Sequence, residues 1–87
     1  MSDAYHLDGN ALAGLLHEAF GSEMTEAERH CPGCGARSAL GAHRAYISAG
    51  AVLRCPACGQ LAVRVAILRD RHVVELTGRW KLAVPRL

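Results

Sequence analysis

Four cysteines, arranged in two short turns of the same pattern, constrain this chain more than any other feature. The turns read CPGCG at residues 31–35 and CPACG at residues 55–59, and they contain every cysteine of the 87 residues. The twenty residues between Cys34 and Cys55 are enough for one strand to leave the first turn and a second to return. Four thiolates paired in this way can form a tetrahedral cage for Zn²⁺. We therefore predict one structural Zn²⁺ bound by Cys31, Cys34, Cys55 and Cys58.

Each of these turns, called a knuckle below, has residues suited to holding sulfur near a metal. The proline after the first cysteine fixes one backbone dihedral, and the glycine after the second can adopt a positive φ. This geometry lets backbone amides approach the sulfurs. Because four sulfurs at about 2.3 Å leave no open position on zinc, the predicted site is structural and not catalytic.

The length of the chain makes the metal important for folding. A core of this size rarely supplies more than about 3–5 kcal/mol. A structural zinc site contributes roughly 10–16 kcal/mol of apparent binding free energy, much of which appears as folding free energy. We therefore expect a single small domain that depends on its metal.

The segment before the first knuckle predicts a short amphipathic helix between Leu7 and Gly21. Leu12, Leu16 and Phe20 recur at helical spacing and define one apolar stripe. Two fates of that stripe remain open: it packs on the rest of the domain, or it docks on a partner. The acidic segment 22–30 follows, where the Thr25 to Glu28 spacing resembles a capping box and suggests a further helical turn.

After the first knuckle the apolar pattern changes to a period of two, which predicts β-strands. One strand is expected across residues 38–47 and a second at 52–54, forming a hairpin around a turn at 48–50. A third is expected at 61–68. Residues 74–84 suggest either one long strand bent at Gly78 or two short strands that meet there.

The predicted fold is therefore a small metal-stabilised α+β domain. An N-terminal amphipathic helix and acidic segment (residues 1–30) precede an antiparallel zinc-ribbon sheet of three to five short strands (residues 31–87). The two parts are expected to pack as a single domain.

The two knuckles resemble those of the zinc-ribbon superfamily, which occurs in transcription factors, RNA polymerase subunits, ribosomal proteins and small bacterial proteins. The wider pattern, HLDGNALAGLLHEAFGSEMT followed by CPGCG and VLRCPACG, is similar to a family of small actinobacterial zinc-ribbon proteins of unknown function. The first resemblance implies a metal-built ribbon, and the second implies a helix and ribbon in one unit. Neither implies a reaction.

Charge is divided unevenly along the chain. All six acidic residues of the first 28 positions lack a basic counterpart there, whereas ten basic residues face only Asp70 and Glu75 from residue 29 onward. Nine of the ten are arginine, which suits carboxylate or phosphate contacts, although codon bias alone also produces an arginine excess. The candidate binding surface comprises Arg44, Tyr46, Arg54, Arg64, Arg69, Arg71 and Arg79.

Three classes of function remain open. The leading one is a non-catalytic module that contacts a protein of the transcription or translation machinery, with Leu12, Leu16 and Phe20 as the candidate docking face. The first alternative is direct nucleic-acid binding through the arginine-rich surface. The second is a redox role, either as a rubredoxin-like iron protein or as a thiol switch.

Other features favour a bacterial cytoplasmic protein that is not an enzyme. The sequence has no glycine-rich phosphate loop, nucleophile elbow or HExxH motif, and its five histidines are scattered. His30, beside Cys31, is expected to be a surface imidazole rather than a ligand. We expect no membrane span and no signal peptide, and a homodimer is an open alternative.

Overall fold

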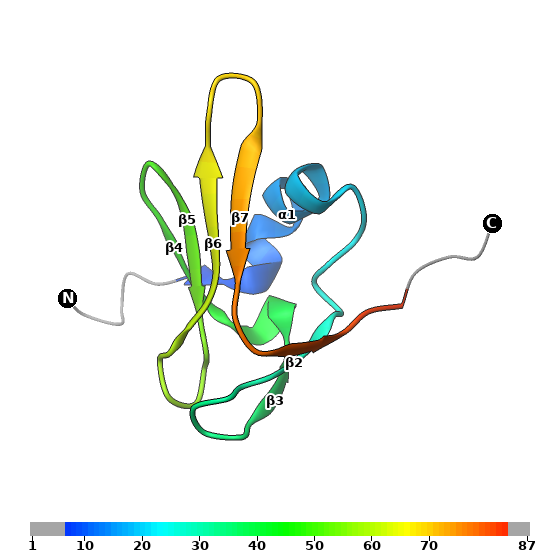
Figure 1. The fold of residues 1–87 in the computed structure, drawn as a ribbon, viewed down its shortest axis with the longest axis vertical. Coiled ribbons are helices and arrows are strands. Elements are labelled where there is room, and N and C mark those ends of the chain that lie inside the picture. The colour runs from blue at the N-terminus through cyan, green and yellow to red at the C-terminus, as the bar shows by residue number, and fades with distance from the viewer. Residues whose placement is uncertain (1–6, 84–87) are drawn as a thin grey trace.

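The structure, a computed structural model, describes residues 7–83 and has an α+β fold with one short α-helix and two antiparallel sheets. Figure 1 shows the larger sheet as an upright layer with helix α1 (Ala13–Phe20) beside it and the smaller sheet below. The expected small α+β class is confirmed at this level. Residues 84–87, where the last predicted strand was expected to end, lie outside the described residues.

The larger sheet has five strands, and its central hairpin was expected from the sequence. Its strands, in spatial order, are β1 (Leu7–Asp8), β4 (Arg44–Ile47), β5 (Gly50–Arg54), β6 (Leu61–Ile67) and β7 (His72–Leu76). Ala45, Leu53 and Val63 lie opposite one another on neighbouring strands, and all three are fully buried. Alternation thus gives this sheet one inner face and one outer face.

The inner face is covered by the segment that was expected to be helical. A 3-10 helix, η2 (Gly9–Leu12), leads into α1; the Asp8 side chain caps η2 by accepting from the Ala11 amide, and Gly21 ends α1 at φ 75°. The helical segment is shorter than predicted because Leu7 and Asp8 pair with β4 as β1. Gly9 is required there, since a Cβ would meet the Leu40 carbonyl oxygen.

The stripe on this helical segment packs on the domain. Leu12 and Leu16 lie in the core, with Leu16 fully buried, and Phe20 is half-buried against it. The sequence left open whether the stripe packs on the domain or docks on a partner, and in the structure it packs on the domain. Leu12 and Leu16 therefore offer no free surface for a partner.

The smaller sheet contains a strand that the sequence did not predict. It consists of β3 (Arg37–Ala39), β2 (Glu28–His30) and β8 (Arg79–Lys81), with β2 in the centre. The suggested helical turn at Thr25 to Glu28 is wrong, because Glu28 begins β2 and the Thr25 hydroxyl and amide bond the Glu23 carboxylate instead.

The predicted strand over residues 38–47 is interrupted. The 3-10 helix η3 (Leu40–Ala42) separates β3 from β4, so the two halves belong to different sheets. Leu40, at its start, is fully buried in the core. Gly78, at φ 91°, similarly separates β7 from β8, which selects two short strands over one bent strand.

Residues before and after position 30 share both sheets. β1 pairs with β4, and β2 pairs with both β3 and β8. Core residues likewise come from both parts, including Leu16, Met24, Leu53 and Val63. The helix-bearing segment is thus built into the same core as the strands that follow it.

Candidate metal centre

The two knuckles have the same pattern of backbone hydrogen bonds, and each belongs to a different sheet. In the first, Gly35 donates to the Cys31 carbonyl and Cys31 to that of Ala36; in the second, the same pattern joins Gly59, Cys55 and Gln60. Gly35 and Gly59 have φ of 77° and 81°. The first knuckle connects β2 with β3, and the second connects β5 with β6. A group held by both knuckles therefore ties the smaller sheet to the larger one.

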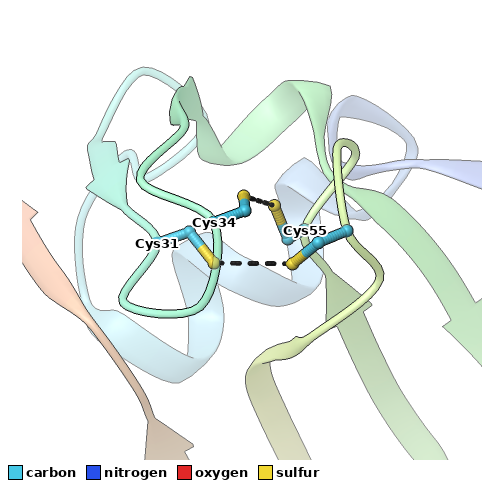
Figure 2. A group of neighbouring side chains, drawn as sticks. Cys31, Cys34 and Cys55 are labelled. Atoms are coloured by element: carbon cyan, nitrogen blue, oxygen red, sulfur yellow. Dashed lines mark hydrogen bonds between the residues drawn. The ribbon is translucent and has the colours of Figure 1, made fainter.

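The four cysteine sulfurs form one compact cluster. All lie within 4.8 Å of one another, with Cys31 Sγ 3.7 Å from Cys58 Sγ and Cys34 Sγ 3.8 Å from Cys55 Sγ. Figure 2 shows the two knuckles presenting these sulfurs to each other. The first cysteine of each knuckle is buried and the second is exposed. The cage thus has a closed inner side and a solvent-facing outer side.

The spacing of the sulfurs fits a four-coordinate metal. A tetrahedron with metal–sulfur bonds of about 2.3 Å has edges of about 3.8 Å. The Cys31–Cys58 and Cys34–Cys55 sulfur separations, 3.7 and 3.8 Å, match that edge. A disulfide needs sulfurs about 2.05 Å apart, and all four thiols are free. The four cysteines can therefore hold one metal ion.

Backbone amides favour the thiolate form of the buried cysteines. Burial opposes ionisation of Cys31, but the amides of Cys34 and Gly33, together with the Cys58 thiol and the Arg29 guanidinium, lower its pKa to about 6. Cys55 shows the same balance: burial alone would raise its pKa, but the amides of Cys58 and Ala57 outweigh burial, so the pKa is lowered from its ordinary value. These N–H groups disperse negative charge on sulfur, as a metal–thiolate centre requires.

The cluster without a metal cannot ionise fully. The Ala36 amide lowers the pKa of Cys34, but burial and the three other sulfurs outweigh it and raise that pKa to about 11. Like charges this close oppose simultaneous ionisation. A divalent cation removes the conflict, because it stabilises all four thiolates together.

Arg29, which sequence reasoning did not assign to the site, is a buried cation beside the first knuckle. Only 1% of it is exposed, and it lies two positions before Cys31. Nε and Nη2 donate to the Thr77 carbonyl and hydroxyl, each at 2.8 Å. Nη1 is buried and has no hydrogen-bond partner among the described residues. A Cys₄ centre with a divalent ion carries a net charge of −2, which suits an adjacent buried guanidinium.

Gln60, directly after the second knuckle, also reaches the cluster. The Cys31 thiol donates to Gln60 Oε1 at 3.2 Å, and the same side chain lies over Gly33. A thiolate has no proton to donate, so metal binding favours the opposite orientation, in which the Gln60 amide N–H faces sulfur. The signal for both Arg29 and Gln60 in the sequence was only their proximity to the knuckles.

The predicted binding-surface residues do not form one patch. Arg44, Tyr46, Arg54 and Arg64 share the outer face of the larger sheet, as the strand register requires. Arg69 and Arg71 lie in the β6–β7 turn, where Arg71 pairs with Asp70 at 3.0 Å. Arg79 belongs to the smaller sheet. His30 is half-buried on that sheet and lies outside the four-cysteine group.

Three of these four residues, Tyr46, Arg54 and Arg64, line a shallow groove. It has a volume of about 450 Å³ and is lined by Tyr46, Val52, Arg54 and Arg64, among others. Arg54 also donates to the Gly59 carbonyl at 3.1 Å, which connects the groove to the second knuckle. Carboxylates lie at its two sides: Glu75 is 3.8 Å from Arg64, and Asp8 is opposite Arg44 in the register.

Within residues 7–83, no helix has the length and apolar character needed to cross a membrane. No curated protein matches the sequence, and no solved structure matches it either. A family model does match residues 2–87, so nearly the full chain is covered, but it shows no zinc-ribbon family and assigns no activity. The chain belongs to the family of unknown function DUF6510.

Proposed function

We propose that this protein is a non-catalytic cytoplasmic binding module in which one structural Zn²⁺ joins its two sheets. The observation that carries the proposal is the cluster of four sulfurs with tetrahedral spacing, contributed by one hairpin of each sheet. Four protein ligands fill the zinc coordination sphere, which leaves no position for a substrate or an activated water. The metal therefore acts on structure, and function lies on the surface that it organises.

Zinc is favoured over iron by the surroundings of the cluster. Both ions accept four thiolates, so the ligands alone do not choose between them. Rubredoxin-like proteins surround iron with aromatic side chains, whereas residues 31–36 and 55–60 contain none. A colourless protein with one zinc per chain is expected after purification without added metal, whereas a red, reducible protein would establish the iron alternative.

Single substitutions test the structural role of the metal. Cys34→Ser and Cys58→Ser alter exposed sulfurs, so neither change disturbs core packing directly. Each should abolish stoichiometric zinc binding and the native near-UV circular dichroism, because three sulfurs cannot close the cage. Ser22→Cys, an exposed substitution away from the cluster, controls for handling of thiols. A folded, zinc-free Cys58→Ser protein would contradict the proposal.

The surface favoured for binding is the groove on the outer face of the larger sheet, and its chemistry fits single-stranded nucleic acid. Arg54 and Arg64 supply cations for the phosphate backbone, and Tyr46 supplies an aromatic ring for base stacking. The expectation of a protein partner loses its docking face, since Leu12 and Leu16 are in the core. Direct nucleic-acid binding, at first the alternative, is therefore the preferred proposal.

Fluorescence anisotropy with a labelled strand of about ten nucleotides tests this binding. The double variant Arg54→Gln/Arg64→Gln should weaken binding and reduce the slope of log K against log salt by about 1.4, or 0.7 for each phosphate that is no longer neutralised. Arg69→Gln/Arg71→Gln removes the same charge from the β6–β7 turn and should change the affinity little. Equal losses in the two variants would indicate nonspecific attraction, and no binding at low salt would refute this role.

A protein partner or a second copy of the chain is the second candidate, favoured by exposed apolar side chains along the β6–β7 hairpin. Ile67, Leu68, Val73 and Leu76 are each 42–51% exposed, and β7 is an edge strand. Exposed edges can pair with another strand. Sedimentation of the wild type and of Val73→Lys tests self-association: a dimer that the substitution dissociates supports it, and a monomer in both excludes the homodimer.

A further inference from the structure

A second hollow lies on the smaller sheet, away from the groove described above. It has a volume of about 220 Å³ and is lined by Glu28, His30, Arg37, Arg79, Trp80 and Lys81. Three of these six side chains are permanent cations, and Glu28 is the only carboxylate. Apart from Arg79, none of its cations was singled out from the sequence.

The strand register explains why these charges converge. His30 is paired with Arg37 on one side and with Arg79 on the other, so the three form a row across the sheet. Lys81 is two positions beyond Arg79 and therefore on the same face, opposite Glu28. Arg37 and Arg79 thus lie on the two outer strands, with β2 between them. A concave surface also focuses their combined potential.

The side chains of these cations lack the carboxylate partners that Arg64 and Arg71 have. Arg64 and Arg71 each have a carboxylate within 4.0 Å. The side chains of Arg37, Arg79 and Lys81 form no hydrogen bond or ion pair with any residue in the range 7–83. Glu28 is half-buried and lies directly opposite Lys81 in the register, and this one carboxylate offsets only part of the charge. The hollow therefore holds an excess of unneutralised positive charge.

We propose that this hollow binds a phosphoryl group. Two arginines can each offer a planar pair of N–H donors to oxyanions, and Lys81 adds a point charge; this combination suits a compact dianion. The two sources of such a group are a free phosphate or nucleotide and the backbone of a nucleic acid. The site lies on a different sheet from the groove, so it goes beyond the proposed function and does not depend on it.

Trp80 provides a direct signal for occupancy of this site. It is the only tryptophan of the chain, and it lines the hollow. Its indole Nε1 donates to the Thr77 carbonyl at 3.0 Å, which fixes the ring against the core. Alternation places the ring on the opposite face of β8 from Arg79 and Lys81, so a bound anion is expected to change its emission through the electric field that acts across the strand.

The test is a titration of the full-length, metal-loaded protein with inorganic phosphate and with pyrophosphate, against sodium chloride of equal ionic strength. Trp80 emission should change saturably with the phosphates and not with chloride. Arg37→Gln and Arg79→Gln should each weaken binding about tenfold or more, because each removes a charged hydrogen-bond donor pair. Arg37→Lys should recover part of the loss, and Arg69→Gln should have no effect.

Three results would overturn the proposal: a linear response equal to that of chloride, wild-type affinity in the Arg37→Gln/Arg79→Gln double variant, or an equal loss in Arg69→Gln. Zinc content and near-UV circular dichroism of each variant exclude unfolding as the cause. Competition separates the sources: an oligonucleotide without terminal phosphates that displaces pyrophosphate indicates the nucleic-acid backbone, whereas displacement only by free phosphates or nucleotides indicates a small molecule. The groove variant Arg54→Gln/Arg64→Gln should still bind pyrophosphate, so the two proposals can fail separately.

Discussion

The Arg29 guanidinium donates to both the backbone carbonyl and the hydroxyl of Thr77, 48 positions away in the sequence. The Thr77 hydroxyl in turn donates to the Leu61 carbonyl at 2.5 Å. Arg29 lies on β2, Leu61 begins β6, and Thr77 lies between β7 and β8. These hydrogen bonds between protein groups therefore connect the smaller sheet to the larger one, and a metal bound by the knuckles would connect the same two sheets.

Arg29→Met should destabilise the folded protein by about 2–4 kcal/mol, because it removes the charged hydrogen bonds that the buried guanidinium donates to the Thr77 carbonyl and hydroxyl. It should also weaken metal affinity about tenfold or more, because the adjacent positive charge is removed. Urea unfolding and a competitive zinc chelator measure the two effects. Thr77→Val, which retains the backbone acceptor, should have the smaller effect on stability. Unchanged zinc affinity in Arg29→Met would show that the guanidinium serves packing alone.

Acidification should release the metal and unfold the protein. Cys31 has a folded pKa of about 6, below the ordinary thiol value of 9.0, so its contribution to stability is fully present above pH 9 and is lost as pH falls through about 6. Protons also compete with the metal for all four sulfurs, in the same direction. Zinc release followed with a colorimetric chelator between about pH 8 and 5 should coincide with loss of near-UV circular dichroism, and zinc retention throughout that range would contradict the assignment.

The buried position of Leu16 predicts a large effect from a small substitution. Leu16→Ala should cost about 2–5 kcal/mol, since it opens a cavity between α1 and the inner face of the larger sheet. Leu68→Ala provides a matched control, because Leu68 is 50% exposed, and should change stability by less than about 0.5 kcal/mol. Thermal melting distinguishes the two. Equal melting temperatures for Leu16→Ala and the wild type would mean that the helix does not pack on the sheet.

Gly78 separates the two sheets and should not tolerate a side chain. It has φ 91°, and a Cβ there would lie 2.9 Å from the His30 carbonyl oxygen. Gly78→Ala should therefore destabilise by about 2 kcal/mol or more. Gly14→Ala is the control: its Cβ meets nothing within 4 Å, and alanine in α1 should be neutral or stabilising by up to about 1 kcal/mol. A reversed order of the two in urea unfolding would be inconsistent with this backbone.

The features that local sequence determines were predictable. The knuckle pattern identified the four cysteines that the structure gathers, and alternation identified β6 almost to the residue. In each case the signal lies within a few neighbouring residues.

The features that depend on distant pairing were not predictable from local patterns. β2 is only three residues long and lies in an acidic segment, so it has no periodicity of its own; it exists because β3 and β8 flank it. The role of Arg29 depends on the same pairing. The alternating pattern across residues 38–47 also gave no sign of η3. That 3-10 helix forms where Leu40 is buried in the core and the chain passes from the smaller sheet to the larger one.

Native mass spectrometry, paired with circular dichroism before and after chelation, tests most directly whether a metal ion joins the two sheets. We expect one zinc ion per chain, four thiols protected from alkylation, and loss of tertiary structure on chelation that added zinc reverses. A metal-free chain that keeps its near-UV spectrum, or a mass two or four units low from cysteines joined to each other, would contradict the account.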